Sequence, residues 1–313
     1  MKKILCLLLF LLLISIAAIY QFIPYKISFT TNRIIGANSN AGNRYLLENN
    51  SNWVNWWPTD SLNKLDTNFS LDGYNFKISN RFVEYTVIDI SKATDSTIHS
   101  VLKFFPVKKD SFLIQWQASV VSGYNPIKKI TAQILVNNLQ KAQSKFLTHF
   151  ENFIKNTTAV YKAPILNKTV TDSLLLSTVL ESITKPDINT IYKLIDELQT
   201  TIKLQQGVIQ DSAMLNISLL SNKWYKTMVA YPITKEVKPG KNQLIKRLVR
   251  GNILVMEKKG GPITIDITAA NLSQFVEDFE MTSPAIPYQK LITNRLIEKD
   301  TSKWITQFYY PVY

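Results

Sequence analysis

The side chains that most often perform chemistry in enzymes are scarce in this sequence. Cys6 is the only cysteine, and His99 and His149 are the only histidines. A single cysteine excludes a disulfide within the chain and a metal site built from cysteines. The two histidines lie far apart without metal-binding spacing, and none follows position 149, which argues against a serine–histidine triad in the C-terminal half. We therefore predict no metal, no cofactor and no catalytic residue.

Aromatic residues form a more informative pattern, because one arrangement occurs twice. Trp224 precedes Tyr231-Pro232-Ile233 in the same way that Trp304 precedes Tyr310-Pro311-Val312. Each set closes a stretch whose hydrophobic periodicity predicts strand, helix, strand and strand, with Asp187 as the N-cap of the first helix. The first copy spans 173–183, 187–205, 214–220 and 224–233, and the second 253–256, 267–281, 287–293 and 304–312. Since one copy is too small to bury much alone, we expect a duplicated β-α-β-β unit with a shared core.

Residues 167–313 resemble the GyrI-like small-molecule-binding domain, the effector-binding domain of AraC-type and multidrug-sensing transcription regulators. The most specific matches are Gly260-Gly261-Pro262, residues 284–288, and the tail over 298–304 and 310–312. The resemblance implies a cleft between two halves, lined with aromatic rings and often holding a carboxylate that meets lipophilic cations. A branch of the family is credited with hydrolysing strained, electrophilic small molecules.

Two positions depart from the family pattern. Ile263 follows the Gly-Pro where the family often has Tyr, and Gln289 follows the Pro-Tyr where the family often has Glu. The second departure replaces the carboxylate of the cleft with an amide. Both charge-assisted cation binding and carboxylate-dependent hydrolysis depend on that carboxylate.

The resemblance also implies which residues line the cleft. Aromatic faces attract cations by about 0.5 to 2 kcal/mol, and Glu298 is the nearest acid in the matching tail. The alternative is that each ring only packs in the core, and that Glu298, which Lys299 and Asp300 follow, is an exposed loop carboxylate. The predicted ligand-binding residues are Trp224, Tyr231, Tyr288, Glu298, Trp304 and Tyr310.

The start of the chain predicts a membrane segment. Lys2-Lys3 precedes an almost unbroken apolar run from Ile4 to Tyr20, and about twenty residues suffice to cross a bilayer as a helix. A cleaved signal peptide is the competing interpretation, although bulky residues stand where a cleavage site needs small ones. The lysine pair places the amino end in the cytoplasm and the soluble domains on the non-cytoplasmic side of a single-pass anchor.

The stretch between the anchor and the GyrI-like part predicts a separate domain. One strand, short helices, several strands and a long helix over 126–155 would wrap a curved sheet around that helix. This order, with Asn-Trp-Val-Asn-Trp-Trp-Pro at 52–58, resembles the START-like or SRPBCC superfamily, which includes polyketide cyclase/dehydrase-like proteins. The resemblance implies a helix pair beside a hydrophobic cavity, whereas the alternative is that Trp53, Trp56 and Trp57 are core packing. Residues 155–171 are polar and contain Pro164, as expected of a linker.

The net charge of +13 does not predict a nucleic-acid partner, because the basic residues are scattered along the chain. A membrane anchor and a strand-rich domain stand where such regulators have a helix-turn-helix, so no direct nucleic-acid binding is expected. The predicted fold class is α+β, with an anchor at 1–25, a helix-grip START-like domain at 26–159 and a GyrI-like domain at 160–313. We predict a membrane-anchored protein that binds lipophilic, including cationic, small molecules without catalysis. The alternatives are a hydrolase detoxifying reactive small molecules in the same cleft, and a structural interaction module of the cell envelope.

Overall fold

The computed structural model describes residues 2–57, 68–92, 97–170, 174–221, 223–248 and 250–313. The chain divides into two compact units, Met1–Asn156 and Thr157–Tyr313. We call them unit 1 and unit 2 and treat each by itself.

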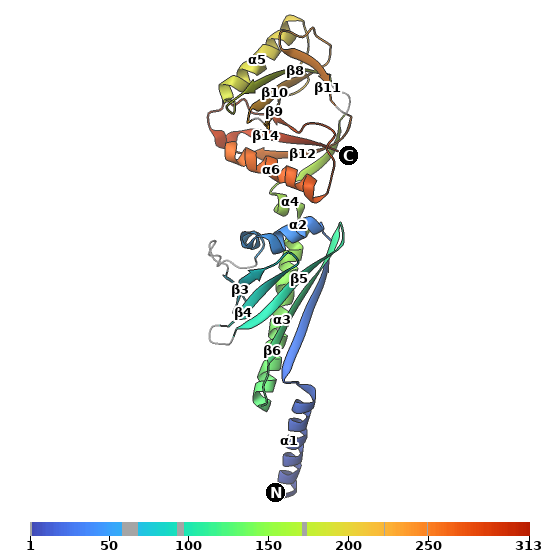
Figure 1. The fold of residues 1–313 in the computed structure, drawn as a ribbon, viewed down its shortest axis with the longest axis vertical. Helices are drawn as coiled ribbons and strands as arrows, with labels where there is room; N and C mark the ends of the chain where they lie inside the picture. Colours follow the sequence, from blue (N-terminus) through green and yellow to red (C-terminus); the bar gives the residue numbers. More distant parts are fainter. Residues whose placement is uncertain (1, 58–67, 93–96, 171–173, 222, 249) are drawn as a thin grey trace. The chain divides into compact units, whose positions relative to one another are not determined.

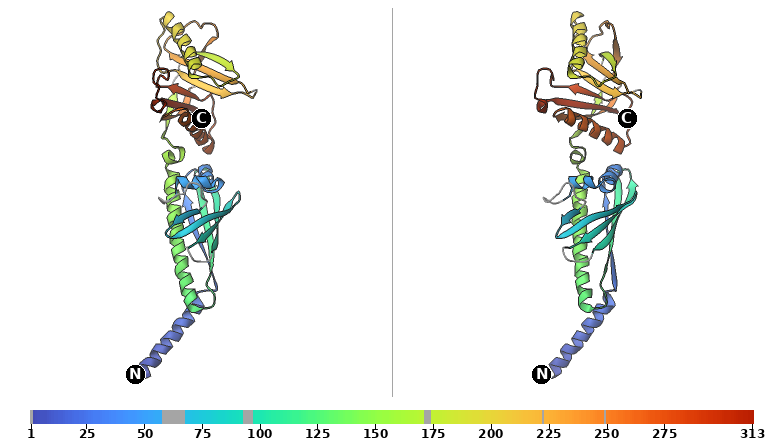
Figure 2. Two further views of the ribbon diagram at one scale, coloured as in Figure 1. Left: turned by 90° about the vertical axis from the view of Figure 1, so that its left-hand side faces the viewer. Right: turned by 60° about the vertical axis from the view of Figure 1, so that its left-hand side comes forward.

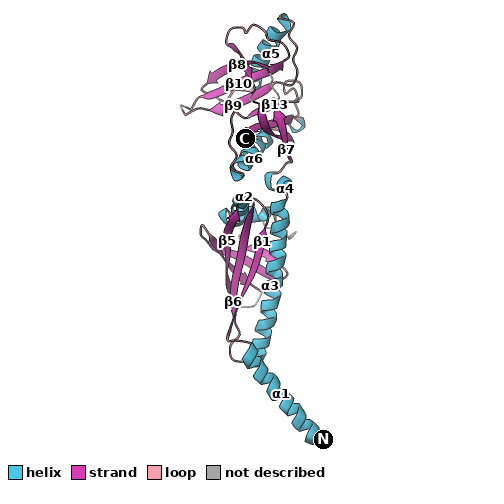
Figure 3. Ribbon diagram, turned by 90° about the vertical axis from the view of Figure 1, so that its right-hand side faces the viewer, coloured by secondary structure: helices cyan, strands magenta, loops and turns pink. Residues whose placement is uncertain are grey.

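Unit 1 begins with the predicted apolar helix, α1 (Lys2–Phe22) (Figure 3). Its stretch Lys3–Phe22 has 20 residues and a mean hydropathy of 2.7, and it is not buried against the rest of the protein. The helix is therefore long and apolar enough to cross a membrane, a property that signal sequences share.

The body of unit 1 is one antiparallel sheet with a long helix against it. The sheet order is β1-β6-β5-β4-β3-β2, and side chains on β6 alternate strictly between buried and half-buried positions, as a strand with one covered face requires. The described residues between β1 and β2 form two short helical turns and one 3-10 turn. The elements are β1 (Lys26–Ile35), α2 (Ser39–Asn43), η1 (Arg44–Glu48), η2 (Asn50–Asn55), β2 (Asn68–Leu71), β3 (Tyr74–Arg81), β4 (Tyr85–Ser91), β5 (Ile98–Lys108) and β6 (Ser111–Val121).

The long helix α3 (Pro126–Lys155) has the predicted bounds. Asn125 caps its first turn by accepting hydrogen bonds from the N–H groups of Ile127 and Lys128, and proline occupies the first position, where its missing N–H costs nothing. One face, which includes Leu139, Phe146 and Phe150, is buried and packs against β1 and β6 (Figure 2).

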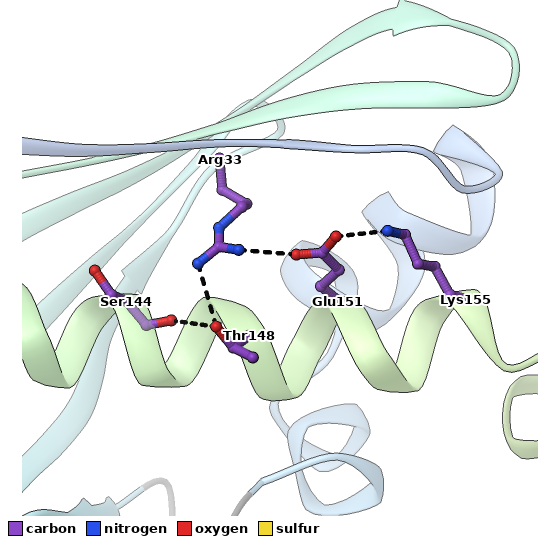
Figure 4. A network of polar contacts seen from close by, with 5 residues as sticks. All are labelled: Arg33, Ser144, Thr148, Glu151 and Lys155. Atoms are coloured by element: carbon purple, nitrogen blue, oxygen red, sulfur yellow. Dashed lines mark hydrogen bonds and ion pairs between the residues drawn. The ribbon is translucent and has the colours of Figure 1, made fainter.

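Hydrogen bonds and ion pairs at the edge of its buried face link α3 to β1 (Figure 4). Arg33 on β1 donates to Glu151 at 3.0 Å and to Thr148 at 3.2 Å. Lys155, one turn further along α3, donates to the other oxygen of Glu151 at 2.6 Å. The hydrogen bond from Lys155, together with the charges of both cations, lowers the pKa of the Glu151 carboxyl.

The three tryptophans after η1 belong to the core of unit 1. Trp53 is fully buried, and its ring stacks on that of Trp57 with centroids 5.8 Å apart. Trp56 contacts Phe146 and Phe150 of α3 edge-on. The core-packing alternative is therefore confirmed for these rings, while Pro58 of the sequence motif lies outside the described residues.

Unit 2 is built on one eight-stranded antiparallel sheet. Its strand order is β11-β8-β10-β9-β13-β14-β12-β7. When β7–β10 and β11–β14 are each numbered first to fourth, the order from either edge to the middle is first, second, fourth, third. The first strand of each set is exchanged, since β7 pairs with β12 and β11 pairs with β8. The elements are α4 (Thr157–Tyr161), β7 (Ile165–Val170), β8 (Leu174–Ser182), α5 (Ile188–Leu204), β9 (Met214–Leu219), β10 (Tyr225–Ile233), β11 (Gln243–Arg247), β12 (Gly251–Lys259), α6 (Pro262–Asp278), β13 (Tyr288–Leu291), η3 (Thr301–Lys303) and β14 (Ile305–Val312).

The two Tyr-Pro markers occupy equivalent places in this sheet. In β10, Tyr231 pairs with Leu176 of β8; in β14, Tyr310 pairs with Leu254 of β12. Helices α5 and α6 lie in matching positions, α5 beside β8 and β10 and α6 beside β12 and β14 (Figure 1). The fold class is thus α+β, with two antiparallel sheets and one apolar helix at the amino end.

Two predictions about unit 2 were wrong. The stretch predicted as a linker contains α4 and β7, because the exchanged strand finds its hydrogen-bond partners in β12, about ninety residues away. The second helix begins at Pro262 and ends at Asp278, whereas the prediction placed it at 267–281. Proline at its first position starts the helix, and Gly260 makes the preceding turn at φ +154°, where a Cβ would lie 2.7 Å from Thr264.

Candidate functional site

A cleft of about 770 Å³ lies over the seam between the two halves of unit 2. The seam is the short pairing of β9 with β13, where Gln289 stands opposite Leu215. The first residues of α5 form one wall of the cleft and the first residues of α6 the other. The lining includes Ile188, Ile191, Leu215, Ile217, Leu219, Tyr225, Ile265, Ala269, Gln289, Arg295 and Trp304.

Strand alternation explains which side chains reach this cleft. On β9, Leu215 and Ile217 point to the face that carries the helices, while Met214 belongs to a cluster on the opposite face. On β13, Gln289 lines the cleft while Tyr288 packs on the opposite face. The cleft floor is therefore apolar, with one amide at its centre.

Arg295 and Trp304 form the polar end of the cleft. The guanidinium carbon of Arg295 lies 5.0 Å from the centroid of the Trp304 ring, within the range of a cation–π contact. Arg295 Nη2 donates to Thr306 Oγ1 at 2.8 Å, and its Nε is buried without a partner among the described residues. Burial lowers the pKa of Arg295, because a charged group loses its hydration there.

Helix α5 holds the loop that presents Arg295. The backbone N–H of Arg295 donates to the hydroxyl of Tyr192 at 2.7 Å, and burial raises the pKa of that tyrosine. The indole N–H of Trp304 donates to the Glu298 carbonyl at 2.9 Å. At the other wall, the N–H of Gly260, just before α6, donates to the Trp304 carbonyl at 2.9 Å. Helix α5 thus holds the backbone of Arg295, and the turn before α6 holds the backbone of Trp304.

The charged residues at the mouth of the cleft already have partners. Lys185 Nζ lies 3.6 Å from Asp266 Oδ2, and both side chains are exposed. Asp187 accepts a hydrogen bond from the N–H of Thr190, which lowers its pKa and confirms its prediction as the N-cap of α5. The two carboxylates in the lining therefore lie at the rim.

A second hollow of about 280 Å³ shares part of this lining. Leu215, Ile217, Ala269 and Gln289 border both spaces. Tyr310 and Tyr288 border the second hollow but not the cleft, and Tyr288 also lines a pocket on the opposite face of the sheet. The side chain of Gln289 therefore stands between two neighbouring cavities.

The structure distributes the six predicted site residues over several places. Trp304 lines the cleft, and Tyr288 and Tyr310 line the adjoining hollow. Tyr231 is buried beneath α5, where its hydroxyl accepts a hydrogen bond from Gln199 at 2.8 Å. Trp224 is 40% exposed ahead of β10 and is not among the residues that line either space.

Glu298 contacts the site through its backbone. Its carbonyl accepts from Trp304, whereas its carboxylate accepts from the N–H of Asp300 at 2.9 Å in an exposed turn. It is not among the described residues that line the cleft or the adjoining hollow.

Of the six predicted site residues, Trp304 alone lines the cleft, so sequence reasoning missed most of its lining, including Tyr225 and Arg295. Tyr225 follows Trp224 and is the first residue of β10. It lies four residues before the buried Val229, and residues four apart in a strand share a face, so strand alternation could have found it. Arg295 stands in an irregular segment after β13, where no periodicity predicts the direction of a side chain. Gln289 was singled out only as a departure from a family pattern.

No family model and no curated protein matches the sequence. Several solved structures are similar to part of this chain. The EcmrR C-terminal domain shares 15% identity at a TM-score of 0.42, covering 48% of this chain and 98% of that one. A hydrolase from Listeria innocua shares 14% identity at a TM-score of 0.37, covering 48% and 92%. SAV2435 bound to tetraphenylphosphonium shares 10% identity at a TM-score of 0.32, covering 48% and 94%.

Proposed function

We propose that unit 2 is a GyrI-like domain that binds a lipophilic small molecule in the cleft between its halves, without catalysis. The observation that carries this proposal is the cleft itself, an open space with an apolar floor and a few convergent polar groups. Such a combination is typical of ligand sites, in which apolar burial supplies affinity and a few polar groups supply orientation. A structural module would instead fill this space with side chains.

The two acids of the lining favour binding over hydrolysis. A hydrolase of this kind needs a carboxylate that orients water against the bound substrate. Asp187 caps a helix and Asp266 pairs with Lys185, both at the exposed rim. Gln289, at the centre of the floor, has an amide that cannot serve as a base.

The expected preference for lipophilic cations would depend on the rings of Tyr225 and Trp304. Arg295 already stands over Trp304, and the six residues first expected to bind are not gathered in one space. The proposal therefore keeps the lipophilic class of ligand and places it on the cleft lining.

We further propose that α1 anchors the chain in a membrane, with a START-like unit 1 and a GyrI-like unit 2 on the non-cytoplasmic side. Aromatic residues at the carboxyl end of α1 support an interface there. Tyr20 donates to the Tyr124 carbonyl at 2.7 Å, and the rings of Tyr25 and Tyr124 lie 4.9 Å apart. Lys129 donates to the carbonyl of Ile23. That the chain does not bind nucleic acid directly stays a prediction.

Filling the cleft tests the binding proposal. Ala269 borders the cleft and the adjoining hollow, whereas its neighbour Ala270 is exposed on α6. We expect Ala269→Trp to abolish binding of 2-naphthamide, measured by calorimetric titration of the full chain in phosphatidylcholine nanodiscs with empty nanodiscs as the blank. Ala270→Trp, an equal change on the outer surface, should bind as the wild type does.

The proposal fails if the wild type binds none of a set of naphthyl probes that are neutral, cationic and anionic. It fails also if Ala269→Trp binds as tightly as Ala270→Trp while both keep the wild-type circular dichroism spectrum.

A further inference from the structure

We propose that the cleft prefers lipophilic anions, in particular aromatic carboxylates, and that Arg295 binds their charged group. This inference rests on the proposed function, since it takes the cleft as a ligand site. It goes beyond that function by naming the ligand's charge and the residue that meets it.

The distribution of charge in the cleft is the first argument. Four charged residues occur in the described lining: Lys185, Asp187, Asp266 and Arg295. The first three are exposed at the rim, where Lys185 and Asp266 pair with each other and Asp187 caps α5. Among these four residues, Arg295 is the one that is not at the exposed rim. No carboxylate in the described part of the chain forms an ion pair with it. The formal charges of these four residues sum to zero, but a ligand group that reaches Arg295 meets a positive charge.

The hydrogen bonding of Arg295 is the second argument. A guanidinium has five N–H donors in a planar fork that suits a carboxylate. Nη2 donates to Thr306 Oγ1, while Nε has no partner among the described residues although it is buried. Burying such a group without full pairing is unfavourable. A bound carboxylate would supply the missing counter-charge and replace the hydration that Arg295 has lost.

The occupation of the Trp304 ring is the third argument. Trp304 is 4% exposed, and Arg295 lies over its ring. The ring that would attract a ligand cation already has a cation of the protein, so a second cation there would meet charge repulsion. Gln289 at the floor can donate its amide N–H groups to an anion. The amino ends of α5 and α6 also face the cleft, and their dipoles favour negative charge.

Three naphthalene probes of one shape and different charge test the preference: 2-naphthoate, 2-naphthamide and N,N,N-trimethyl-2-naphthylammonium. They are titrated by calorimetry into the full chain in zwitterionic phosphatidylcholine nanodiscs, with empty nanodiscs as the blank. Because a hydrogen bond to a charged group is worth at least about one factor of ten in affinity, we expect naphthoate to bind at least about tenfold more tightly than the ammonium probe. Naphthamide should lie between them.

Variants attribute the preference to Arg295. Arg295→Gln should lower the affinity for naphthoate by a larger factor than the affinity for naphthamide, so that the two probes bind about equally. Lys193→Gln is the matched control, since Lys193 is an exposed cation of α5 outside the cleft lining. It should leave all three affinities unchanged. Gln289→Glu introduces a negative charge at the floor, so it should weaken naphthoate binding and strengthen binding of the ammonium probe.

Each outcome bears on the inference separately from the proposed function. Equal or tighter binding of the ammonium probe by the wild type overturns the preference for anions while the cleft remains a binding site. Unchanged naphthoate affinity in Arg295→Gln, or an equal loss in Lys193→Gln, overturns the role of Arg295. If Arg295→Gln does not fold, Gln289→Glu decides, and an unaltered order of probes in that variant refutes the inference. Binding of none of the probes to the wild type refutes the proposed function itself.

Discussion

Removing the hydroxyl of Tyr192 tests whether α5 holds the loop that presents Arg295. This hydroxyl accepts from the Arg295 N–H at 2.7 Å and lies 3.4 Å from the Thr293 carbonyl. The first contact is short and the second is at the limit of a hydrogen bond. Tyr192→Phe therefore removes one good hydrogen bond and leaves a backbone N–H without its acceptor. The contact is partly buried, and a fully buried donor left unsatisfied would cost about 1 to 3 kcal/mol.

Hydrogen exchange measures this cost locally. Because about 1.4 kcal/mol corresponds to a factor of ten, the amide of Arg295 should exchange about ten to a hundred times faster in Tyr192→Phe. Mass spectrometry of peptides that span residues 292–304 reports this amide. Naphthoate affinity should fall in parallel, since Arg295 would no longer be held over Trp304.

Tyr231→Phe is the matched control for this prediction. It removes an equally buried tyrosine hydroxyl beneath the same helix, whose partner is the side chain of Gln199. Exchange of the Arg295 amide should not change in this variant. Equal rates in the two variants, or an unchanged rate in Tyr192→Phe, would refute the idea that α5 orders the site through Tyr192.

Two further predictions concern unit 1. Removing residues 1–24 should give a soluble, folded protein. Removing only residues 1–22 should give a melting temperature, measured by circular dichroism, that is higher than that of the first truncation, because the carbonyls of Ile23 and Pro24 still accept from Lys129 and Ser122. Aggregation of both truncations would contradict this prediction. Glu151→Gln should lower the unfolding free energy by about 1 kcal/mol at neutral pH, since it breaks the contacts with Arg33 and Lys155. The folded-state pKa of Glu151 is below its unfolded value, so this stabilisation is present above about pH 4 and lost as the pH falls further. A difference from the wild type that persists at pH about 2 in fluorescence-monitored unfolding would contradict this assignment.

Local signals in the sequence were enough to predict elements whose conformation depends mainly on neighbouring residues. The apolar run of α1, the N-cap Asp187 and the proline start of α3 act within one or two turns of chain. The repeated Tyr-Pro pairs were also informative, because two similar segments that make the same contacts take equivalent places in one sheet.

Other features depended on partners distant in sequence. β7 has the polarity of a linker, and it is a strand because β12 offers it backbone partners. Such pairing is decided by the topology of the sheet rather than by local propensity.

The candidate site shows the same division. The sequence determined that aromatic rings accompany the Tyr-Pro strands and that position 289 has an amide. The tertiary structure decided which of them share a cavity: it buried Tyr231 beneath α5, placed Glu298 in an exposed turn, and brought Arg295 over Trp304 from a loop without periodicity. The charge in a cleft is a sum over side chains from several elements, so its sign becomes known only when strands and helices far apart in the chain have been brought together.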